Sequence, residues 1–336
     1  MKPYTYLLIA MILTLCIDAD AIPRAKITVI VKDEDGTLLS DAEVNVSFAL
    51  PKKLGAEWGS GLFKTVKQLT DSHGKCVISG DTAASLGLSV GKAGYYGSAG
   101  QTIEFTDVVL GHWQPWNQTI EVVLKKIVNP IPMYARKVEV RSKTKIQSVI
   151  KSGEVMAYDL EKGDWIIPYG RGETADFIFQ IKAKPERAEK NQFGENVKLF
   201  DATLVLSFSN AGDGIQHVLN ETRRDSVLRL PRIAPDAGYK VNHTSRTYHL
   251  TLNEPTQSEN KNLLDYFFRV RTKMDEQGNI SSALYGKIYG EIGWDIVGRI
   301  KITYYLNPTP NDRNVEFDPT KNLFKKLTSL EEVHDP

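Results

Sequence analysis

The chain has 336 residues, of which 41% are hydrophobic, 9% aromatic and 25% charged. This composition is typical of soluble globular proteins and unlike that of disordered or fibrous ones. The formal net charge is only +1, so no overall field favours nucleic acid, an anionic membrane or an acidic substrate. At roughly 100 to 200 residues per domain, the length predicts about two domains.

Residues 1–21 have the pattern of a secretory signal peptide. After Lys2 comes an apolar run, Tyr6–Ile17, followed by Ala19 and Ala21 in the spacing that signal peptidase reads. The run falls well short of the ~20 residues needed to cross a bilayer, so no transmembrane segment is predicted. We therefore expect a secreted or periplasmic protein, cleaved after Ala21. Lipidation at Cys16 is a less favoured alternative, because a leucine precedes it where that processing needs a small residue.

The segment after the leader alternates apolar and polar residues with the two-residue period of β-strands. The inward set is Ile27, Val29 and Val31 on the first predicted strand, and Val44, Val46 and Phe48 on the second. Between them, Asp33–Gly36 supplies turn residues, which predicts a hairpin or near-hairpin. Further strands are expected within residues 69–78, 86–90, 102–105 and 118–128.

Four stretches of this half resemble a known family. They are ITVIVKDEDGTLLSDAEVNV, LTDSHGKCVI, LSVGKAGYYG and TIEVVLKK, and together they are similar to the carboxypeptidase regulatory-like domain. The resemblance covers roughly residues 25–128. It implies a transthyretin-like (prealbumin-like) β-sandwich for residues 22–128 and an accessory, non-catalytic role. The sequence departs from the family pattern at Pro51–Leu62 and at Leu110–Trp116.

Prolines at positions 130 and 132 interrupt any strand ladder, because proline lacks the N–H donor. We therefore expect a linker over residues 129–140 and a second antiparallel β-sandwich over residues 141–317. Residues 318–336 are expected to form a short helix and tail, with Asp318 as N-cap and Pro319 at the first helical position. Its apolar stripe would pack on its own domain and comprises Leu323, Phe324, Leu327 and Leu330. The predicted fold class is all-β, with two antiparallel sandwiches and a short C-terminal helix.

No familiar catalytic or cofactor motif is recognised. Gly87–Lys92 is too short for a phosphate-binding loop and lacks its hydroxyl, and Gly170–Gly172 precedes a predicted strand where a dinucleotide fingerprint requires a helix. No G-x-S-x-G elbow occurs. Cys76, the one cysteine after cleavage, lies in strand register and is expected to be buried. The histidines lack metal-ligand spacing, so neither a metal nor another cofactor is predicted.

Two tryptophans are the strongest binding candidates. Trp113 and Trp116 lie in a predicted loop beside His112, and the pair Tyr95 and Tyr96 is expected nearby. Exposed rings are the usual platform for a sugar face or a partner side chain. The competing interpretation is that both tryptophans fix their own loop to the sandwich.

These patterns favour an exported, non-catalytic interaction or structural module that binds a glycan, a cell-wall component or a protein, and no nucleic acid. The alternative is a secreted hydrolase of unfamiliar type, with its site in the second domain among Glu173, Asp176, His217, His243 and His249. A basic stripe is expected to be the solvated face of a sheet and comprises Arg269, Arg271, Lys273, Lys287, Arg299 and Lys301. The oligomeric state is left open.

Overall fold

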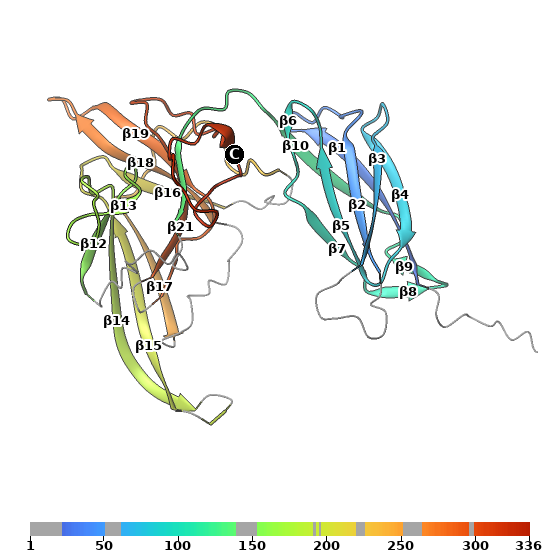
Figure 1. The fold of residues 1–336 in the computed structure, drawn as a ribbon, viewed down its shortest axis with the longest axis horizontal. Coiled ribbons are helices and arrows are strands. Elements are labelled where there is room, and N and C mark those ends of the chain that lie inside the picture. The colour runs from blue at the N-terminus through green and yellow to red at the C-terminus, as the bar shows by residue number, and fades with distance from the viewer. Residues whose placement is uncertain are drawn as a thin grey trace, which may run out of the picture. The chain divides into compact units, whose positions relative to one another are not determined.

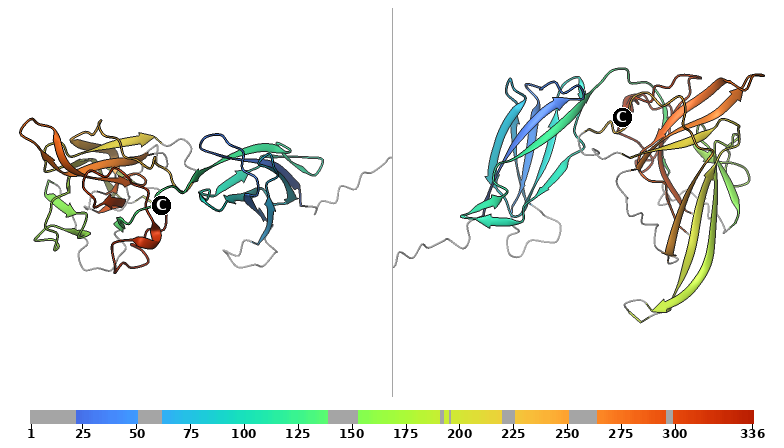
Figure 2. Two further views of the ribbon diagram at one scale, coloured as in Figure 1. Left: turned by 90° about the horizontal axis from the view of Figure 1, so that it is seen from above. Right: turned by 180° about the vertical axis from the view of Figure 1, so that it is seen from behind.

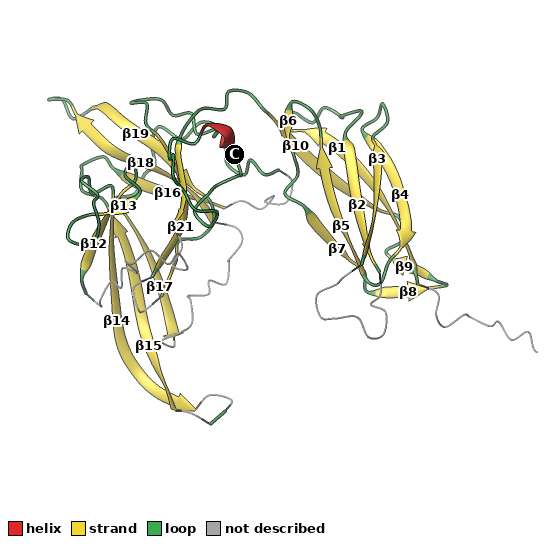
Figure 3. Ribbon diagram, viewed as in Figure 1, coloured by secondary structure: helices red, strands yellow, loops and turns green. Residues whose placement is uncertain are grey.

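The computed structural model describes residues 22–50, 62–138, 153–190, 193–194, 196–219, 226–250, 264–295 and 299–336. Across these ranges the regular structure is strand, apart from one 3-10 turn at Pro319–Lys321 (Figures 1 and 3). The predicted all-β class is confirmed. The chain divides into two compact units: unit 1 is Met1–Gly91 with Gly100–Val122, and unit 2 is Lys92–Ala99 with Val123–Pro336.

Unit 1 is built from two sheets that are largely antiparallel, and Arg24 and His112 form a parallel pair. Its strands are β1 (Arg24–Asp33), β2 (Glu43–Ala49), β3 (Phe63–Leu69), β4 (Lys75–Asp81), β5 (Ser85–Gly91), β7 (Gln101–Glu104), β8 (Asp107–Val109), β9 (His112–Gln114) and the first part of β10 (Gln118–Lys126). One sheet has the order β3-β2-β5-β7. The other has the order β6-β10-β1-β9-β8, with β4 paired to β1, and its β6 (Tyr95–Tyr96) is assigned to unit 2.

The alternation in the sequence sets the core of unit 1. Ile27, Val29 and Val31 are buried on β1, and the inward residues of β2 are equally buried, as predicted. Cys76 is buried as well, and burial followed by the charge of Asp71 raises the pKa of its thiol to about 11. The thiol therefore stays protonated at neutral pH and behaves as a small apolar side chain.

Unit 2 contains two further sheets. Its strands are β11 (Tyr134–Val138), β12 (Val155–Asp159), β13 (Asp164–Trp165), β14 (Phe177–Lys190), β15 (Asn196–Ser207), β16 (Gly214–Leu219), β17 (Asn242–Leu250), β18 (Leu264–Met274), β19 (Ile280–Ile288), β20 (Gly293–Trp294) and β21 (Ile300–Asn307). One sheet has the order β13-β12-β14-β15-β17 and the other β11-β21-β19-β18-β16, with β20 paired to β21. The far ends of β14 and β15 extend beyond the rest of their sheet in the right-hand view of Figure 2.

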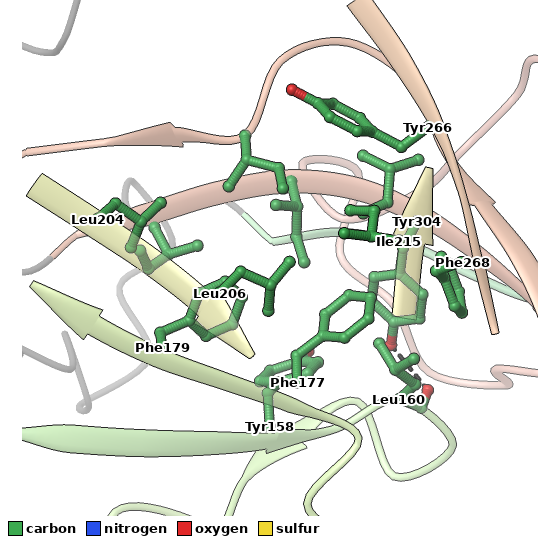
Figure 4. Packing of buried hydrophobic residues seen from close by; sticks show 14 of the residues in the cluster. Tyr158, Leu160, Phe177, Phe179, Leu204, Leu206, Ile215, Tyr266, Phe268 and Tyr304 are labelled. Atoms are coloured by element: carbon green, nitrogen blue, oxygen red, sulfur yellow. Dashed lines mark hydrogen bonds between the residues drawn. The ribbon is translucent and has the colours of Figure 1, made fainter. Parts of the chain in front are cut away.

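An aromatic core fills the space between these two sheets (Figure 4). Phe177 of β14 meets Phe268 of β18 with ring centroids 5.0 Å apart. Tyr304 of β21 is fully buried, and its hydroxyl donates to the carbonyl of Leu160 at 2.8 Å. Apolar burial from both sheets therefore holds unit 2 together, as in an ordinary sandwich.

The second face of the β11–β16 sheet is also covered, which overturns the prediction of a solvated basic stripe at Lys287 and Arg269, although Lys273 is exposed. A separate cluster packs on it, including Phe267, Tyr305 and Phe317 together with residues of the 226–240 and 308–336 segments. Lys287 is consequently 0% exposed and Arg269 is buried too, whereas Lys301 does face solvent. Alternation predicts which residues share a face, but it cannot tell whether a coil segment covers that face.

Two further expectations differ from the structure. Part of the predicted linker at 129–140 is strand β11, and the division between the units passes through β10. The expected C-terminal helix is wrong beyond the 3-10 turn, although Asp318 caps that turn as predicted. The reason is tertiary: the C-terminal segment runs extended along β11, with the Leu323 amide donating to the Met133 carbonyl at 3.0 Å. These bonds cover an otherwise open sheet edge.

Candidate functional site

The β8–β9 hairpin of unit 1 carries the tryptophan region. Val109 pairs with His112, so the connecting turn consists of Leu110 and Gly111. Both have positive φ, 50° and 77°, which is the geometry of a two-residue type I′ turn. The first position of such a turn normally holds Asn, Asp or Gly, because larger side chains resist the left-handed region.

The hairpin exposes its aliphatic side chains. Leu110 is 92% exposed, and Val108 and Val109 are 45% and 53% exposed. A leucine in this turn therefore carries a conformational penalty, and burial of its side chain within the protein does not offset that penalty. Backbone strain of this kind persists where it serves a function, so the turn is a candidate contact point.

Trp113 is committed to the fold. Its indole Nε1 donates to the Thr82 carbonyl at 2.8 Å, and its ring stacks on Phe105 with centroids 6.0 Å apart. The side chain is half-buried. The interpretation that this tryptophan fixes its own segment to the sandwich therefore fits Trp113.

Trp116 is placed differently and is 39% exposed. The His112 ring meets it edge-on at 4.4 Å, and the Lys26 ammonium lies 5.9 Å from its ring centroid. The next residue, Asn117, donates its amide to the Lys26 carbonyl at 2.9 Å, which holds the segment on β1. Trp116 thus presents part of its ring to solvent from a fixed backbone.

Tyr95 and Tyr96 do not belong to this region, because they are part of unit 2. Tyr96 is nearly buried, and its hydroxyl donates to Glu316 at 2.9 Å. Burial, and then this bond to a carboxylate, raise the pKa of Tyr96 well above its usual value. Tyr95 lies opposite Lys126 in the β6–β10 ladder. The expectation that both tyrosines would join the tryptophans is not met.

Other exposed apolar residues gather at the hairpin's end of unit 1. Leu62 and Phe63 begin β3, and Phe63 is 65% exposed. Four backbone bonds tie this end together: Leu50 N to Leu62 O, Ala83 N to Ala49 O, Thr82 N to Pro23 O, and Arg24 N to Gly111 O. We call the set the apolar end, and it comprises Leu62, Phe63, Val108, Val109, Leu110 and Trp116.

The sequence held one usable signal for the apolar end. Both stretches that depart from the family pattern, Pro51–Leu62 and Leu110–Trp116, contribute to it. Leu110–Gly111 was not recognised as a turn, because leucine is not a turn-forming residue.

The residues of the hydrolase alternative are held apart by different partners. Asp176 and Asp159 are buried and both bind the guanidinium of Arg271, at 2.9 Å and 3.1 Å. Glu173 is exposed and forms an ion pair with Lys162 at 3.5 Å. Within the described residues no hydrogen bond joins either of these candidate carboxylates to a candidate histidine.

The Arg271 cluster is a closed ion network. Burial raises the pKa of Asp176 even though Arg271 opposes the shift. Asp159 is also desolvated, but amides at Lys162, Glu173 and Thr174 together with Arg271 hold its pKa below the usual value. Arg271 itself has a φ of 55° at an irregularity in the β18–β19 ladder. With its carboxylates engaged by amides and the guanidinium, the cluster ties the 159–176 loop to β18.

The candidate histidines lie on strands of different sheets, His217 on β16 and His243 on β17. The His243 ring packs edge-on against Tyr266 at 5.3 Å, and Tyr266 is the cross-strand partner of His217. Burial, and then the charge of His217, lower the pKa of His243, so it is neutral at pH 7. The side chain of His249 lies outside the described residues.

Two features, a metal-binding cluster and a membrane-spanning helix, are not found among the described residues. No group of three or more His, Cys, Asp or Glu side chains is arranged to hold a metal ion in the ranges that the structure covers. No described helix has the length and apolar character needed to cross a membrane.

No protein-family model and no curated protein sequence matches the chain. Among solved structures, similar chains include the 3-chlorocatechol 1,2-dioxygenase of Rhodococcus opacus, at 14% identity and a TM-score of 0.24, over 33% of this chain and 62% of that one. Another is a mutant of the shaft pilin SpaA of Lactobacillus rhamnosus GG, at 12% identity and a TM-score of 0.23, over 57% of this chain and 90% of the pilin. The chain thus spans about three fifths of the dioxygenase, and at these TM-scores neither likeness bears on what the chain does.

Proposed function

We propose that the chain is an exported, non-catalytic binding module whose contact surface is the apolar end of unit 1. Unit 1 would be a transthyretin-like sandwich of the accessory kind that its sequence resembles. The leader at residues 1–21 supports export, because its apolar run and its Ala19 and Ala21 fit signal-peptidase processing.

The observation that carries the proposal is Leu110. Its left-handed φ is unfavourable, and its 92% exposed side chain gains nothing from burial in the free protein, whereas an asparagine would relieve the strain. A partner that covers the leucine would make the same side chain favourable. Contiguous exposed apolar residues on a soluble domain are a common sign of such a surface.

The chemistry of the apolar end favours an apolar partner over a glycan. Sugar recognition uses a flat ring with hydrogen-bonding groups around it. Trp113 is occupied by Phe105 and Thr82, and the His112 ring lies against Trp116. The most prominent side chains are the aliphatic ones on β8 and in its turn.

The contact surface is tested by site-specific photo-cross-linking in cells of the source organism. A photoreactive residue at position 110 is expected to give adducts, whereas one at position 77 is not, although Val77 is also an exposed apolar residue of unit 1. Equal labelling at both positions, or none at either, would contradict the assignment of the surface. The intact mass of recovered protein tests export, with Ile22 expected at the N-terminus.

Catalysis is tested separately with a panel of hydrolase substrates, and glycan binding with a glycan array. We expect no turnover, because Asp159 and Asp176 are both paired with Arg271. Turnover that is lost on His243→Gln or Glu173→Gln would support the hydrolase alternative instead.

A further inference from the structure

We propose that the apolar end of unit 1 docks on the surface of a lipid bilayer, with the β8–β9 turn entering the interfacial region. This inference rests on the proposed function, since it names the partner of the same surface. A bilayer can cover the exposed apolar side chains without a protein pocket of matching shape.

The apolar end lies close to the leader along the chain. The Arg24 amide donates to the Gly111 carbonyl at 2.9 Å, so the start of β1 lies directly beside the exposed turn. The apolar run Tyr6–Ile17 ends about seven residues earlier, a stretch that spans at most ~25 Å even when fully extended. Until cleavage after Ala21 releases the chain, its length keeps the apolar end within this distance of a bilayer that holds the run.

The side chains of the apolar end are aliphatic and aromatic, with a lysine close by. Aliphatic residues occupy the turn and the strand leading into it, and Phe63 is exposed at the same end. Trp116 is partly exposed beside them, with the Lys26 ammonium near its ring. Aliphatic side chains that enter the acyl region, with a tryptophan and basic residues at headgroup level, are the typical pattern of interfacial membrane contacts.

The charge of the protein predicts which lipid headgroups it needs. Arg24 is paired with Asp81 at 3.6 Å, and the whole chain carries a formal charge of only +1. Coulombic attraction to anionic headgroups is therefore weak, and salt screens it further. Apolar contact should dominate, so a zwitterionic bilayer is sufficient.

The shape of the hairpin favours lipid over a protein partner. Its two-residue turn lies at the end of the sandwich where β4 also ends (Figure 1). A protein partner would need a pocket for Leu110 and polar groups for the open edge of β8, since β9 pairs with β1. A bilayer interface accepts apolar tips without such complementarity and leaves that edge hydrated.

The test uses the chain from Ile22 to Pro336 and phosphatidylcholine vesicles, read by co-sedimentation and by quenching of tryptophan emission with brominated acyl chains. We expect salt-insensitive binding. Leu110→Asn should weaken it at least about tenfold without lowering the melting temperature, because asparagine suits the turn. Val77→Thr, a matched change at an exposed apolar site on β4, should leave binding unchanged.

Three results would overturn membrane docking: no binding to these vesicles, equal binding by wild type and Leu110→Asn, or binding that requires anionic lipid and disappears with salt. The cross-linking experiment distinguishes failure of this inference from failure of the proposed function. Adducts at position 110 that contain protein and no lipid would retain the binding module while removing the bilayer as its partner.

Discussion

The two ends of unit 1 solve the problem of reversing a strand in opposite ways. At one end, Asp33 and Asp71 each begin an Asp-x-x-Gly turn, and each carboxylate accepts two backbone amides. The glycines Gly36 and Gly74 take the left-handed positions without a steric penalty. At the apolar end, Leu110 takes a left-handed position with no such help. One end follows turn chemistry, whereas the other departs from it and exposes apolar surface.

The difference suggests that the first end serves folding and the second serves contact. Unit 2 repeats the first arrangement, since Asp275 accepts amides from Gln277 and Asn279 before the chain enters β19. Asp-x-x-Gly turns are thus the ordinary way in which this chain makes a tight connection. The Leu110 turn is an exception, and variants at both ends can test why.

The largest effect is expected for Gly74→Ala. Gly74 has a φ of 65°, and an added Cβ would lie 2.6 Å from the backbone oxygen of Val31. The left-handed conformation costs ~1–2 kcal/mol for a side chain, and the forced backbone shift adds to it. Urea unfolding followed by circular dichroism should show that the free energy of unfolding falls by more than ~3 kcal/mol, since overpacking costs ~1–3 kcal/mol beyond the conformational penalty.

Gly111→Ala is the matched control at the apolar end. Its φ is 77°, but the added Cβ meets no atom within 4 Å. The loss should therefore be limited to the conformational penalty of ~1–2 kcal/mol. Equal losses for the two alanine variants would show that tight packing does not distinguish the ends.

The next effect separates the two tryptophans. Trp113→Ala removes a stacked, hydrogen-bonded ring and should destabilise unit 1 by about 3 kcal/mol, the lower part of the range for truncating a buried aromatic residue. Trp116→Ala should cost less than ~1 kcal/mol, because its ring is partly exposed. Thermal melts of the single variants decide this, and a larger loss at Trp116 would remove it from the contact surface.

A smaller effect of opposite sign is expected for Leu110→Asn. Asparagine tolerates the left-handed region and is a preferred first residue of this turn. The free energy of unfolding should therefore rise, by up to ~1 kcal/mol. A fall would mean that Leu110 stabilises the free protein, and the reasoning from its strain would no longer hold.

The smallest effect is a pH dependence at the turn end. Amides of Lys75 and then His73 hold the pKa of Asp71 below its ordinary value of 3.8. Because the folded pKa is the lower one, the carboxylate stabilises the fold fully above pH 3.8 and loses this effect as pH falls through the folded pKa. The urea midpoints of wild type and Asp71→Asn should therefore differ at pH 7 and approach each other near pH 3. A constant difference would contradict the role of the ionised carboxylate.

Local features of the chain were readable from its sequence. Period-two alternation placed Ile27, Val29 and Val31 in one core, because a strand puts every second side chain on the same face. Asp33–Gly36 was recognisable as a turn, since its hydrogen bonds join residues within five positions of one another. These features depend on neighbours in the sequence, so the all-β class followed from them.

What only the tertiary structure decided was which surfaces are covered. Lys287 was predicted to be solvated, yet the cluster that includes Phe267, Tyr305 and Phe317 buries it on the second face of its sheet. The segment after Asp318 looked helical, yet bonds to β11 hold it extended. Leu110 was in no predicted turn, yet it is an exposed turn residue. Coverage depends on contacts between residues far apart in sequence, and no local pattern records whether such a contact forms.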